Sequence, residues 1–248
     1  MSESAVHRLR IPKARLRDGR LRLEGSELHY LRDVLRLRRG ARVEIFDGEG
    51  QSFLTDLAAI GPTGAELVLR EAVARRSESP LALTLAVAVA KASKLDWVVE
   101  KVTELGVARI VPFASERTIA AVERAASRID RWRRIASAAA AQSGRARCPQ
   151  VVAIETFAKL LPLAAAHDCS LLFSPGGRPS LAESAGGVVH SAVVVTGPEG
   201  GFSATEVAQA IEAGFRLATL GPRVLRAETA AIAAVALAQH RWGDLGRP

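Results

Sequence analysis

The sequence predicts an α/β protein with a small β-rich N-terminal domain followed by a larger domain built on a parallel sheet. Residues 7–73 contain short apolar segments that are separated by turn dipeptides such as Asp47-Gly48. From residue 81 onward, strand-like apolar runs alternate with helical patterns, which is typical of a parallel sheet covered by helices. A polar stretch ending in proline lies between the two parts. We therefore divide the chain into a domain at 1–74, a linker at 75–80 and a domain at 81–248.

The N-terminal domain is expected to form a small β-barrel. A helix over 27–35, with Ser26 as its cap, interrupts the strands at 21–23, 42–46 and 52–60. In the C-terminal domain the expected strands are 81–90, 109–113, 151–154, 170–173, 188–196 and 215–220. The expected helices there are 95–105, 121–143, 203–213 and 227–241.

Two glycine-containing loops near the C-terminus are the most informative feature. The first, Thr-Gly-Pro-Glu-Gly-Gly-Phe-Ser at 196–203, follows an apolar strand and precedes a helix marked by the capping-box pair Ser203 and Glu206. The second, Gly-Pro-Arg-Val-Leu-Arg at 221–226, also joins a strand to a helix. Ligands of α/β proteins lie at such turns, where glycine lets the backbone approach closely. The sequence therefore predicts a ligand site where the two loops converge.

The first loop does not have the pattern of a nucleotide-phosphate site. It lacks the Gly-Lys-Ser/Thr ending of a P-loop and the Gly-x-Gly-x-x-Gly spacing of a dinucleotide fold. A neutral or zwitterionic ligand held by backbone groups fits it better. An ordinary tight connection is the alternative.

Positive charge is concentrated at the N-terminus. The net charge is +8, and residues 1–42 hold twelve Lys and Arg against five Asp and Glu. Such a region indicates a polyanionic partner, most simply a nucleic acid. GC-rich coding, or a merely solvated charged face, would give a similar composition.

Several other classes of function are disfavoured. The five histidines show no ligand spacing with each other or with Cys148 and Cys169, and no Gly-x-Ser-x-Gly elbow is present. Two cysteines are too few for a disulfide framework. The chain opens without an apolar signal segment, and its longest apolar runs are too short for a membrane span. We expect a cytoplasmic protein with neither a metal nor a membrane as a partner.

Four stretches together resemble a known family. They are 196–206, 220–230, 101–107 with Pro112, and Gln-Ser-Gly-Arg at 142–145. The chain resembles the bacterial ribosomal RNA small-subunit methyltransferase E family, which belongs to the SPOUT, or trefoil-knot, methyltransferases. Residues 29–37, Gly40 and 46–50 are similar to that family's PUA-like RNA-binding domain. Two positions depart from the family pattern: Ala141 stands where the family usually has Glu, and Ala227 replaces a commoner Thr.

The resemblance implies methylation of N3 of one uridine in 16S ribosomal RNA, with S-adenosylmethionine (SAM) as methyl donor. It implies a PUA-like β-barrel followed by a SPOUT α/β domain whose C-terminal chain forms a deep trefoil knot. It also implies a homodimer that binds 16S ribosomal RNA or the small ribosomal subunit. Other SPOUT activities, on ribose 2′-OH or guanine N1, and a non-catalytic ribosome-assembly factor are the alternatives.

We expect the cofactor to be held by backbone groups of the two loops, with apolar side chains around the adenine. The expected cofactor-binding residues are Leu172, Thr196, Gly197, Pro198, Glu199, Gly200, Gly201, Leu220, Gly221, Leu225, Arg226, Glu228, Thr229 and Ala230.

Arg226 is the expected catalytic residue. Removal of the uracil N3 proton leaves negative charge on the flanking carbonyl oxygens, which a fixed guanidinium stabilises. A salt bridge from Arg226 to Glu199 or Glu228 is the structural alternative. The general base stays unassigned, with Glu199 and Glu228 as candidates by location.

The expected RNA contacts come from the basic N-terminal region and from the 142–145 motif. The candidates are Arg8, Arg10, Arg15, Arg17, Arg32, Arg36, Arg38, Arg39, Gln142 and Arg145. For Arg145, substrate contact and structural pairing are both open.

Overall fold

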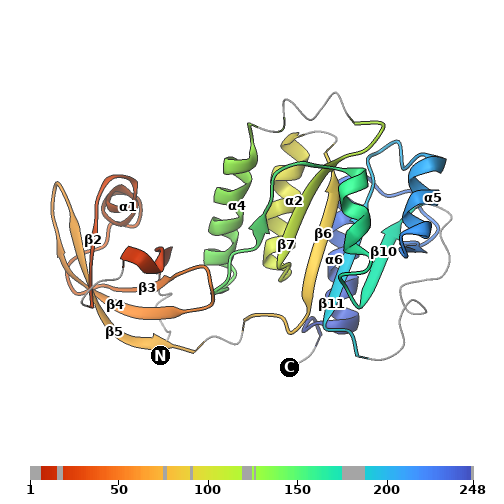
Figure 1. Cartoon of the computed structure of the whole chain (residues 1–248). Helices are drawn as coiled ribbons and strands as arrows, with labels where there is room; N and C mark the ends of the chain where they lie inside the picture. Colours follow the sequence, from red (N-terminus) through yellow and green to blue (C-terminus); the bar gives the residue numbers. More distant parts are fainter. Residues whose placement is uncertain are drawn as a thin grey trace. The chain divides into compact units, whose positions relative to one another are not determined.

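The structure is a computed structural model that describes residues 7–15, 19–74, 77–89, 92–118, 125, 127–174 and 188–246. The chain forms two compact units (Figure 1). One comprises Met1–Glu78 together with Ala140–Cys148, and the other comprises Ser79–Ala139 together with Pro149–Pro248. The division at 75–80 stays a prediction, and the return of residues 140–148 to the N-terminal unit is a feature that it did not contain.

The N-terminal unit is built on a curled five-stranded sheet (Figure 1). Strand β1 pairs parallel with β3, and the other neighbours are antiparallel. Leu, Ile and Val side chains from the strands and the helical segment form one buried cluster, which includes Ile11, Leu31 and Ile45. In spatial order the strands are β1 (His7–Arg10), β3 (Arg42–Phe46), β4 (Ser52–Ile60), β5 (Ala65–Val73) and β2 (Arg20–Leu23).

The helix expected over 27–35 differs in its start and in its type. Helix α1 (Gly25–His29) follows Glu24 as N-cap, without a side-chain capping hydrogen bond, so the Ser26 cap was wrong. The chain continues as a π-helical segment, Tyr30–Val34. Gly25, at φ 57°, adopts a conformation that is costly for other residues and makes the turn from β2 into the helix.

The second unit is built on an all-parallel sheet, as the alternation of strands and helices predicted. Its main path is β12 (Arg216–Ala218), β10 (Cys169–Phe173), β11 (Ser191–Thr196), β6 (Ala82–Ala88), β7 (Arg109–Ala114) and β8 (Gln150–Val151), and β9 (Glu155–Thr156) also pairs with β7. The described helical elements are α2 (Ala92–Glu104), α4 (Ile129–Gln142), α5 (Ala204–Glu212), α6 (Ala227–Trp242) and the 3₁₀ helix η4 (Phe157–Leu163).

Both faces of this sheet are buried, because alternate residues of each strand contribute to different clusters. Ala192 and Val194 of β11 belong to the cluster that contains α2 and α6. Val193 and Val195 belong to the other cluster, with η4 and α5. The helices therefore cover the two faces separately, and the carboxyl ends of the strands stay available for ligands.

Several expected element bounds need correction. Of the expected strand 151–154, only Val151 lies in a strand, at the end of β8. The pairing with β7 resumes at Glu155 in β9, because Pro112 of β7 has no N–H for the ladder. The expected strand 188–196 begins at Ser191, since the backbone N–H groups of His190 and Ser191 donate to the Asp168 carboxylate. The strand at 215–220 covers only Arg216–Ala218, opposite Leu171–Phe173.

The helix expected over 121–143 is described from Ile129 to Gln142, and residues 121–124 and 126 lie outside the described residues. The expected deep knot stays a prediction, since the chain between β10 and β11 includes residues 175–187, which also lie outside them.

Candidate active site

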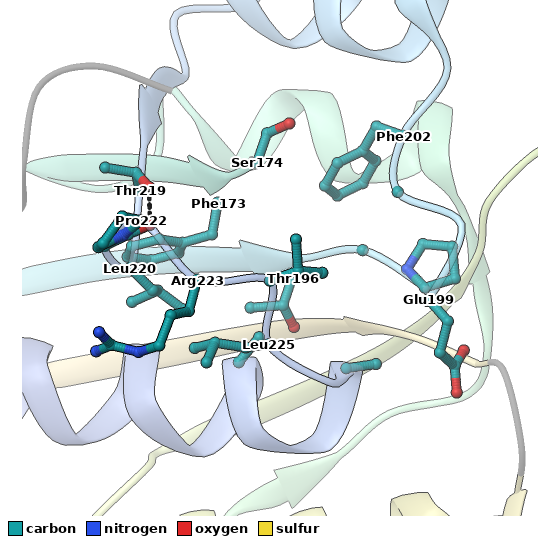
Figure 2. A pocket seen from close by; sticks show the side chains of 17 residues that line it. Phe173, Ser174, Thr196, Glu199, Phe202, Thr219, Leu220, Pro222, Arg223 and Leu225 are labelled. Carbon is teal, nitrogen blue, oxygen red and sulfur yellow. Dashed lines mark hydrogen bonds between the residues drawn. The ribbon is translucent and has the colours of Figure 1, made fainter. Parts of the chain in front are cut away.

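A cavity of about 490 Å³ lies at the carboxyl ends of three adjacent parallel strands, β10, β11 and β12 (Figure 2). Its volume is within the range typical of small-molecule sites. The segments that follow these strands form its wall, and the first turns of α6 complete it. The lining residues are Phe173, Ser174, Thr196, Gly197, Pro198, Glu199, Gly201, Phe202, Thr219, Leu220, Gly221, Pro222, Arg223, Val224, Leu225, Ala227 and Ala230.

The first glycine loop is held in a tight turn by its own backbone. The Gly201 N–H donates to the Pro198 carbonyl at 2.8 Å, and Gly201 has φ 71°. A Cβ at Gly197 would lie 2.9 Å from the Phe202 ring. That ring is fixed in turn, with its centroid 6.4 Å from the centroid of Phe113. Glycine at 197 therefore lets the backbone reach the cavity against a rigid aromatic side chain.

The predicted capping box at the start of α5 is present. The Glu206 N–H donates to the Ser203 hydroxyl, and the Ser203 N–H donates to the Glu206 carboxylate at 2.9 Å. Glu206 is only 1 % exposed, and its second oxygen accepts the Glu116 N–H at 3.0 Å. The same carboxylate therefore joins the glycine loop to the turn that follows β7.

Arg117, in that turn, donates from Nη1 to the Gly200 carbonyl. No motif marks Glu116 or Arg117, because a single sequence contains no signal that relates residue 116 to residue 206.

The second loop is shaped by Gly221 and by the start of α6. Gly221 has φ 98°, and its carbonyl accepts the Thr219 hydroxyl at 3.1 Å (Figure 2). Arg226 is the N-cap residue of α6, but its side chain makes no capping hydrogen bond. Its backbone carbonyl accepts the Ala230 N–H at 2.8 Å. The second loop therefore joins the end of β12 directly to the start of α6.

One polar atom of the cavity wall is buried without a partner among the described residues. Thr196, at the carboxyl end of β11, is 1 % exposed and lines the cavity, and its Oγ1 atom has no hydrogen bond there. A buried hydroxyl without a partner costs free energy. A ligand that supplies a hydrogen-bonding group at this depth would remove that cost.

Lys94 of α2 connects the first loop to the start of α6, the helix that follows the second loop, a contact that the sequence did not indicate. Its Nζ atom lies 3.0 Å from Glu199 Oε1 in the first loop and 3.1 Å from Glu228 Oε2 in the first turn of α6. The two hydrogen bonds, first that of Glu199 and then that of Glu228, raise the pKa of Lys94 above its ordinary value. The amine is therefore a permanent cation at neutral pH.

The pKa values of both carboxylates are lowered. For Glu199, partial burial acts to raise the pKa, and the hydrogen bonds from its own N–H and from Lys94 outweigh it. For Glu228, the largest cause is the hydrogen bond from its own backbone N–H at the helix start, and Lys94 adds to it. Both groups are ionised at neutral pH, which makes them weak general bases there.

The structure brings most of the predicted cofactor residues to the cavity wall. The predicted residues that line it are Thr196, Gly197, Pro198, Glu199, Gly201, Leu220, Gly221, Leu225 and Ala230. Those that do not are Leu172, Gly200, Arg226, Glu228 and Thr229.

Leu172 is buried among side chains of the cluster that contains η4 and α5, whereas its neighbour Phe173 lines the cavity. The alternation of a strand separates the two residues.

Arg226 and Arg223 differ in their relation to the cavity. Arg223 lines it, and Figure 2 shows its side chain and that of Glu199 extending on opposite sides of the lining. Arg226 is exposed and does not line it. Neither Glu199 nor Glu228 forms an ion pair with Arg226 in the described part of the chain. Both carboxylates form ion pairs with Lys94 instead. The salt bridge considered for Arg226 is therefore absent there.

The predicted RNA-binding arginines divide into two groups. Four are engaged with other groups of the N-terminal unit: Arg8 with Glu44, Arg15 with Glu27, Arg32 with Asp33, and Arg145 with Glu78. Four are exposed and have no side-chain hydrogen bond or ion pair within the described residues: Arg10, Arg36, Arg38 and Arg39. Arg17 lies outside the described residues, and Gln142 is exposed.

Arg145 is held by structural pairing. It is 4 % exposed, and its Nη2 atom lies 3.0 Å from Glu78 Oε2. The other Glu78 oxygen accepts the N–H groups of Ala146 and Arg147 at 2.9 and 2.8 Å. The Ser77 hydroxyl donates to the Gly144 carbonyl at 2.7 Å. Residues of the expected linker thus fasten the 142–145 motif to the N-terminal unit.

Within the described residues there is neither a metal-binding cluster nor a membrane-spanning helix. No group of three or more His, Cys, Asp or Glu side chains gathers there in a way that could hold a metal ion. None of the helices described there combines the length and the apolar character that crossing a membrane requires.

Comparison with known proteins agrees with this geometry. Residues 77–239 match the RNA methyltransferase domain family, and residues 23–70 match the RNA methyltransferase PUA domain family. Ribosomal RNA small subunit methyltransferase E of Synechocystis is 34 % identical over 237 residues, which cover 93 % of this chain and 76 % of that protein. The Bacillus subtilis protein of the same name is 27 % identical, over 88 % and 89 % of the two chains.

Solved structures are similar over almost their whole length. The Neisseria gonorrhoeae ribosomal RNA small subunit methyltransferase E bound to SAM has a TM-score of 0.87 and 34 % identity, with 96 % of this chain and 99 % of that one covered. A Legionella pneumophila protein described as a methyltransferase, in complex with SAM, has a TM-score of 0.89 and 28 % identity, with coverage of 98 % and 100 %. The chain therefore belongs to the ribosomal RNA small subunit methyltransferase E family.

Proposed function

We propose that this protein is a SAM-dependent methyltransferase that forms 3-methyluridine in 16S ribosomal RNA. The observation that carries the proposal is the cavity at the carboxyl ends of β10, β11 and β12, walled by two glycine loops. Family membership supports the reaction class, and the names of relatives point to small-subunit ribosomal RNA as the substrate.

The residues present fit SAM. The cavity of about 490 Å³ is large enough for a ligand of that size. The apolar side chains of Phe173, Leu220 and Leu225 suit an adenine ring, and the unpartnered Thr196 hydroxyl can bond one of its polar atoms or the ribose. When bound, SAM supplies a methyl group that its sulfonium already activates, so the protein's task is to position it.

The protein must also handle the acceptor nitrogen. A uracil N3 carries a proton at neutral pH, and its loss leaves negative charge on the neighbouring carbonyl oxygens. We assign stabilisation of that charge to Arg226, whose exposed guanidinium stands where the second loop meets α6. Glu199 and Glu228 are assigned to the Lys94 bridge instead of proton removal, because their pKa values are lowered. The proton then passes to solvent.

RNA binding is assigned to the N-terminal unit. Arg36, Arg38 and Arg39 are exposed without partners in the described part of the chain, and Arg36 has φ 54°, a conformation uncommon for arginine. Reversal of Arg36 and Arg38 to Glu should weaken RNA binding across sequences and flatten its salt dependence. A uridine in folded RNA must also be turned out of its stack to reach the cavity.

Two parts of the proposal concern the state of the protein in the cell. We propose a homodimer, as the family resemblance implies, and light scattering of the purified protein tests it. We also propose a cytoplasmic location, where ribosomal RNA is available. A monomer at micromolar concentration would contradict the proposed homodimer.

Nucleoside analysis of ribosomal RNA from cells that lack this protein tests the reaction. Loss of 3-methyluridine alone is the expected result. Loss of a 2′-O-methylated nucleoside or of 1-methylguanosine would assign another SPOUT activity. A non-catalytic assembly factor would be supported by two results together. No modified nucleoside would be lost, and mass spectrometry would find neither SAM nor its demethylated product in the purified protein.

A further inference from the structure

The glycine loop of the N-terminal unit, Asp47–Gln51, has an unusually rigid backbone. The buried Asp47 carboxylate accepts three successive N–H groups through Oδ1, those of Glu49, Gly50 and Gln51, at 2.7, 3.0 and 2.9 Å. The Asp47 N–H donates to the Gln51 carbonyl at 3.0 Å. A side chain that bonds its own following backbone in this way fixes a turn. The loop is therefore a firm platform for whatever lies against it.

Two arginine side chains lie against this platform. A Cβ placed at Gly48 would be 2.6 Å from Arg10 Nε, and one at Gly50 would be 3.0 Å from Arg147 Nε. Gly48 and Gly50 have φ 83° and 122°, so both positions also require glycine for their backbone. The two glycines thus leave room for one guanidinium beside each of them.

Arg147 is brought to this place by the chain that returns from α4. Gly48 and Glu49 each form a β-bridge with Arg147, and the Gly50 N–H donates to the Ala146 carbonyl at 3.1 Å. The Ala146 and Arg147 N–H groups also donate to the Glu78 carboxylate, which fixes the same segment. Arg10 and Arg147, which are 137 positions apart in sequence, therefore lie against the same loop.

These two guanidiniums differ from most arginines around them. Arg8, Arg15, Arg20, Arg22, Arg32, Arg70 and Arg145 all have a carboxylate partner. Arg10 and Arg147 are exposed, and within the described residues their side chains have no hydrogen bond or ion pair. The nearest exposed carboxylate on the loop is that of Glu49. Guanidiniums that are positioned but not neutralised are suited to phosphate.

We propose that Arg10 and Arg147, which lie next to Gly48 and Gly50 of the Asp47–Gln51 loop, form a binding site for backbone phosphates of the RNA substrate. The proposal rests on the proposed function for the identity of the RNA, and it adds Arg147, which the basic N-terminal region does not contain. The site reads no sequence, because it touches phosphate, and it fixes the position of the RNA on the protein.

The test is the salt dependence of binding by the full chain to a fluorescent transcript of 16S ribosomal RNA. In the double variant Arg10→Gln, Arg147→Gln, the dissociation constant should rise about tenfold per arginine, and the slope of log Kd against log [KCl] should fall by roughly 1.5. The matched control is Arg20→Gln, Arg70→Gln, which removes the same net charge from arginines paired with Glu66 and Asp56. It should keep the wild-type slope.

Equal slopes in the two double variants would overturn the proposal, because net charge alone would then explain binding. A wild-type slope in the Arg10 and Arg147 variant would do the same. Glu49→Gln should tighten binding severalfold by removing the carboxylate beside the site. Calorimetry of SAM binding without RNA tests the proposed function separately. If the wild-type protein does not bind SAM, the proposed function fails, and the salt dependence of RNA binding still tests the phosphate site.

Discussion

The Nζ atom of Lys94 lies 3.0 Å from the Oε1 atom of Glu199, and the two residues are 105 positions apart in the chain. Glu199 lines the cavity, and the same amine reaches Glu228 at the start of α6. A single cation from α2 therefore joins the first glycine loop to the helix that follows the second loop.

Replacement of Lys94 by Met should weaken SAM binding while leaving the fold intact. The two carboxylates would lose their shared cation and repel each other across the loops. Partly exposed ion pairs contribute modestly, so the Kd for SAM should rise severalfold. Calorimetry measures the effect. Lys101→Met, on the same helix but paired with Glu100 and Glu104, is the control and should bind SAM normally.

The contribution of this bridge to stability should depend on pH in a defined way. The pKa values of Glu199 and Glu228 are lowered, so their contribution is fully present above the ordinary value of 4.5 and is lost as pH falls through the lower native values. The pKa of Lys94 is raised, so its contribution is present below 10.5 and is lost as pH rises through the higher native value. The Tm difference between wild type and Lys94→Met should be constant from pH 5 to 10. A maximum or minimum near pH 7 would contradict this.

Arg226→Ala should separate catalysis from cofactor binding. The side chain does not line the cavity, so SAM affinity should stay close to that of the wild type. Loss of a donor that stabilises the uracil oxyanion should lower single-turnover methylation at least ~100-fold. Unchanged turnover would remove Arg226 from the mechanism. Arg223→Ala, at a residue that does line the cavity, should instead raise the Kd for SAM.

Glu206→Ala should destabilise the protein strongly. The buried carboxylate accepts the N–H groups of Ser203 and Glu116, and alanine would leave both without their partner. The cost is about 3 kcal/mol, which corresponds to a fall in Tm of roughly 6–12 °C. Glu206→Gln keeps an acceptor and should recover part of this. A thermal scan of both variants gives the answer, and equal Tm values for Ala and wild type would refute the prediction.

Arg145→Ala should act on stability and not directly on RNA contact. It leaves the half-buried Glu78 without its cation, at a cost of about 3 kcal/mol. Because Arg145 is 4 % exposed, the salt dependence of RNA binding by the folded fraction should keep the wild-type slope. A reduced slope with unchanged stability would show that Arg145 meets phosphate instead.

Local patterns in the sequence predicted those parts of the structure that local physics determines. The capping box of Ser203 and Glu206 and the parallel sheet follow from spacing and alternation. The Ser26 cap was wrong because the helix begins two positions earlier than expected, at Gly25, whose positive φ makes the turn from β2.

Long-range pairing was invisible to the sequence analysis. Charge patterning placed Arg8 among the RNA contacts, and the 142–145 motif left RNA contact open for Arg145. Both side chains pair with carboxylates distant in sequence, Glu44 and Glu78. Lys94 and Arg147 were missed for the same reason. Whether an arginine or lysine stays unpaired depends on which distant carboxylates the fold brings next to it. Composition does not contain that information.

The order of strands in the sheet has a consequence for synthesis of the protein. Strand β12 adds beside β10, on the side away from β11, and it is the last strand in sequence. A nascent polypeptide that ends before Arg216 can have the first glycine loop but lacks the opposite wall of the cavity. The methyl donor can therefore be captured only after translation is almost complete, and a chain truncated by premature termination cannot sequester it.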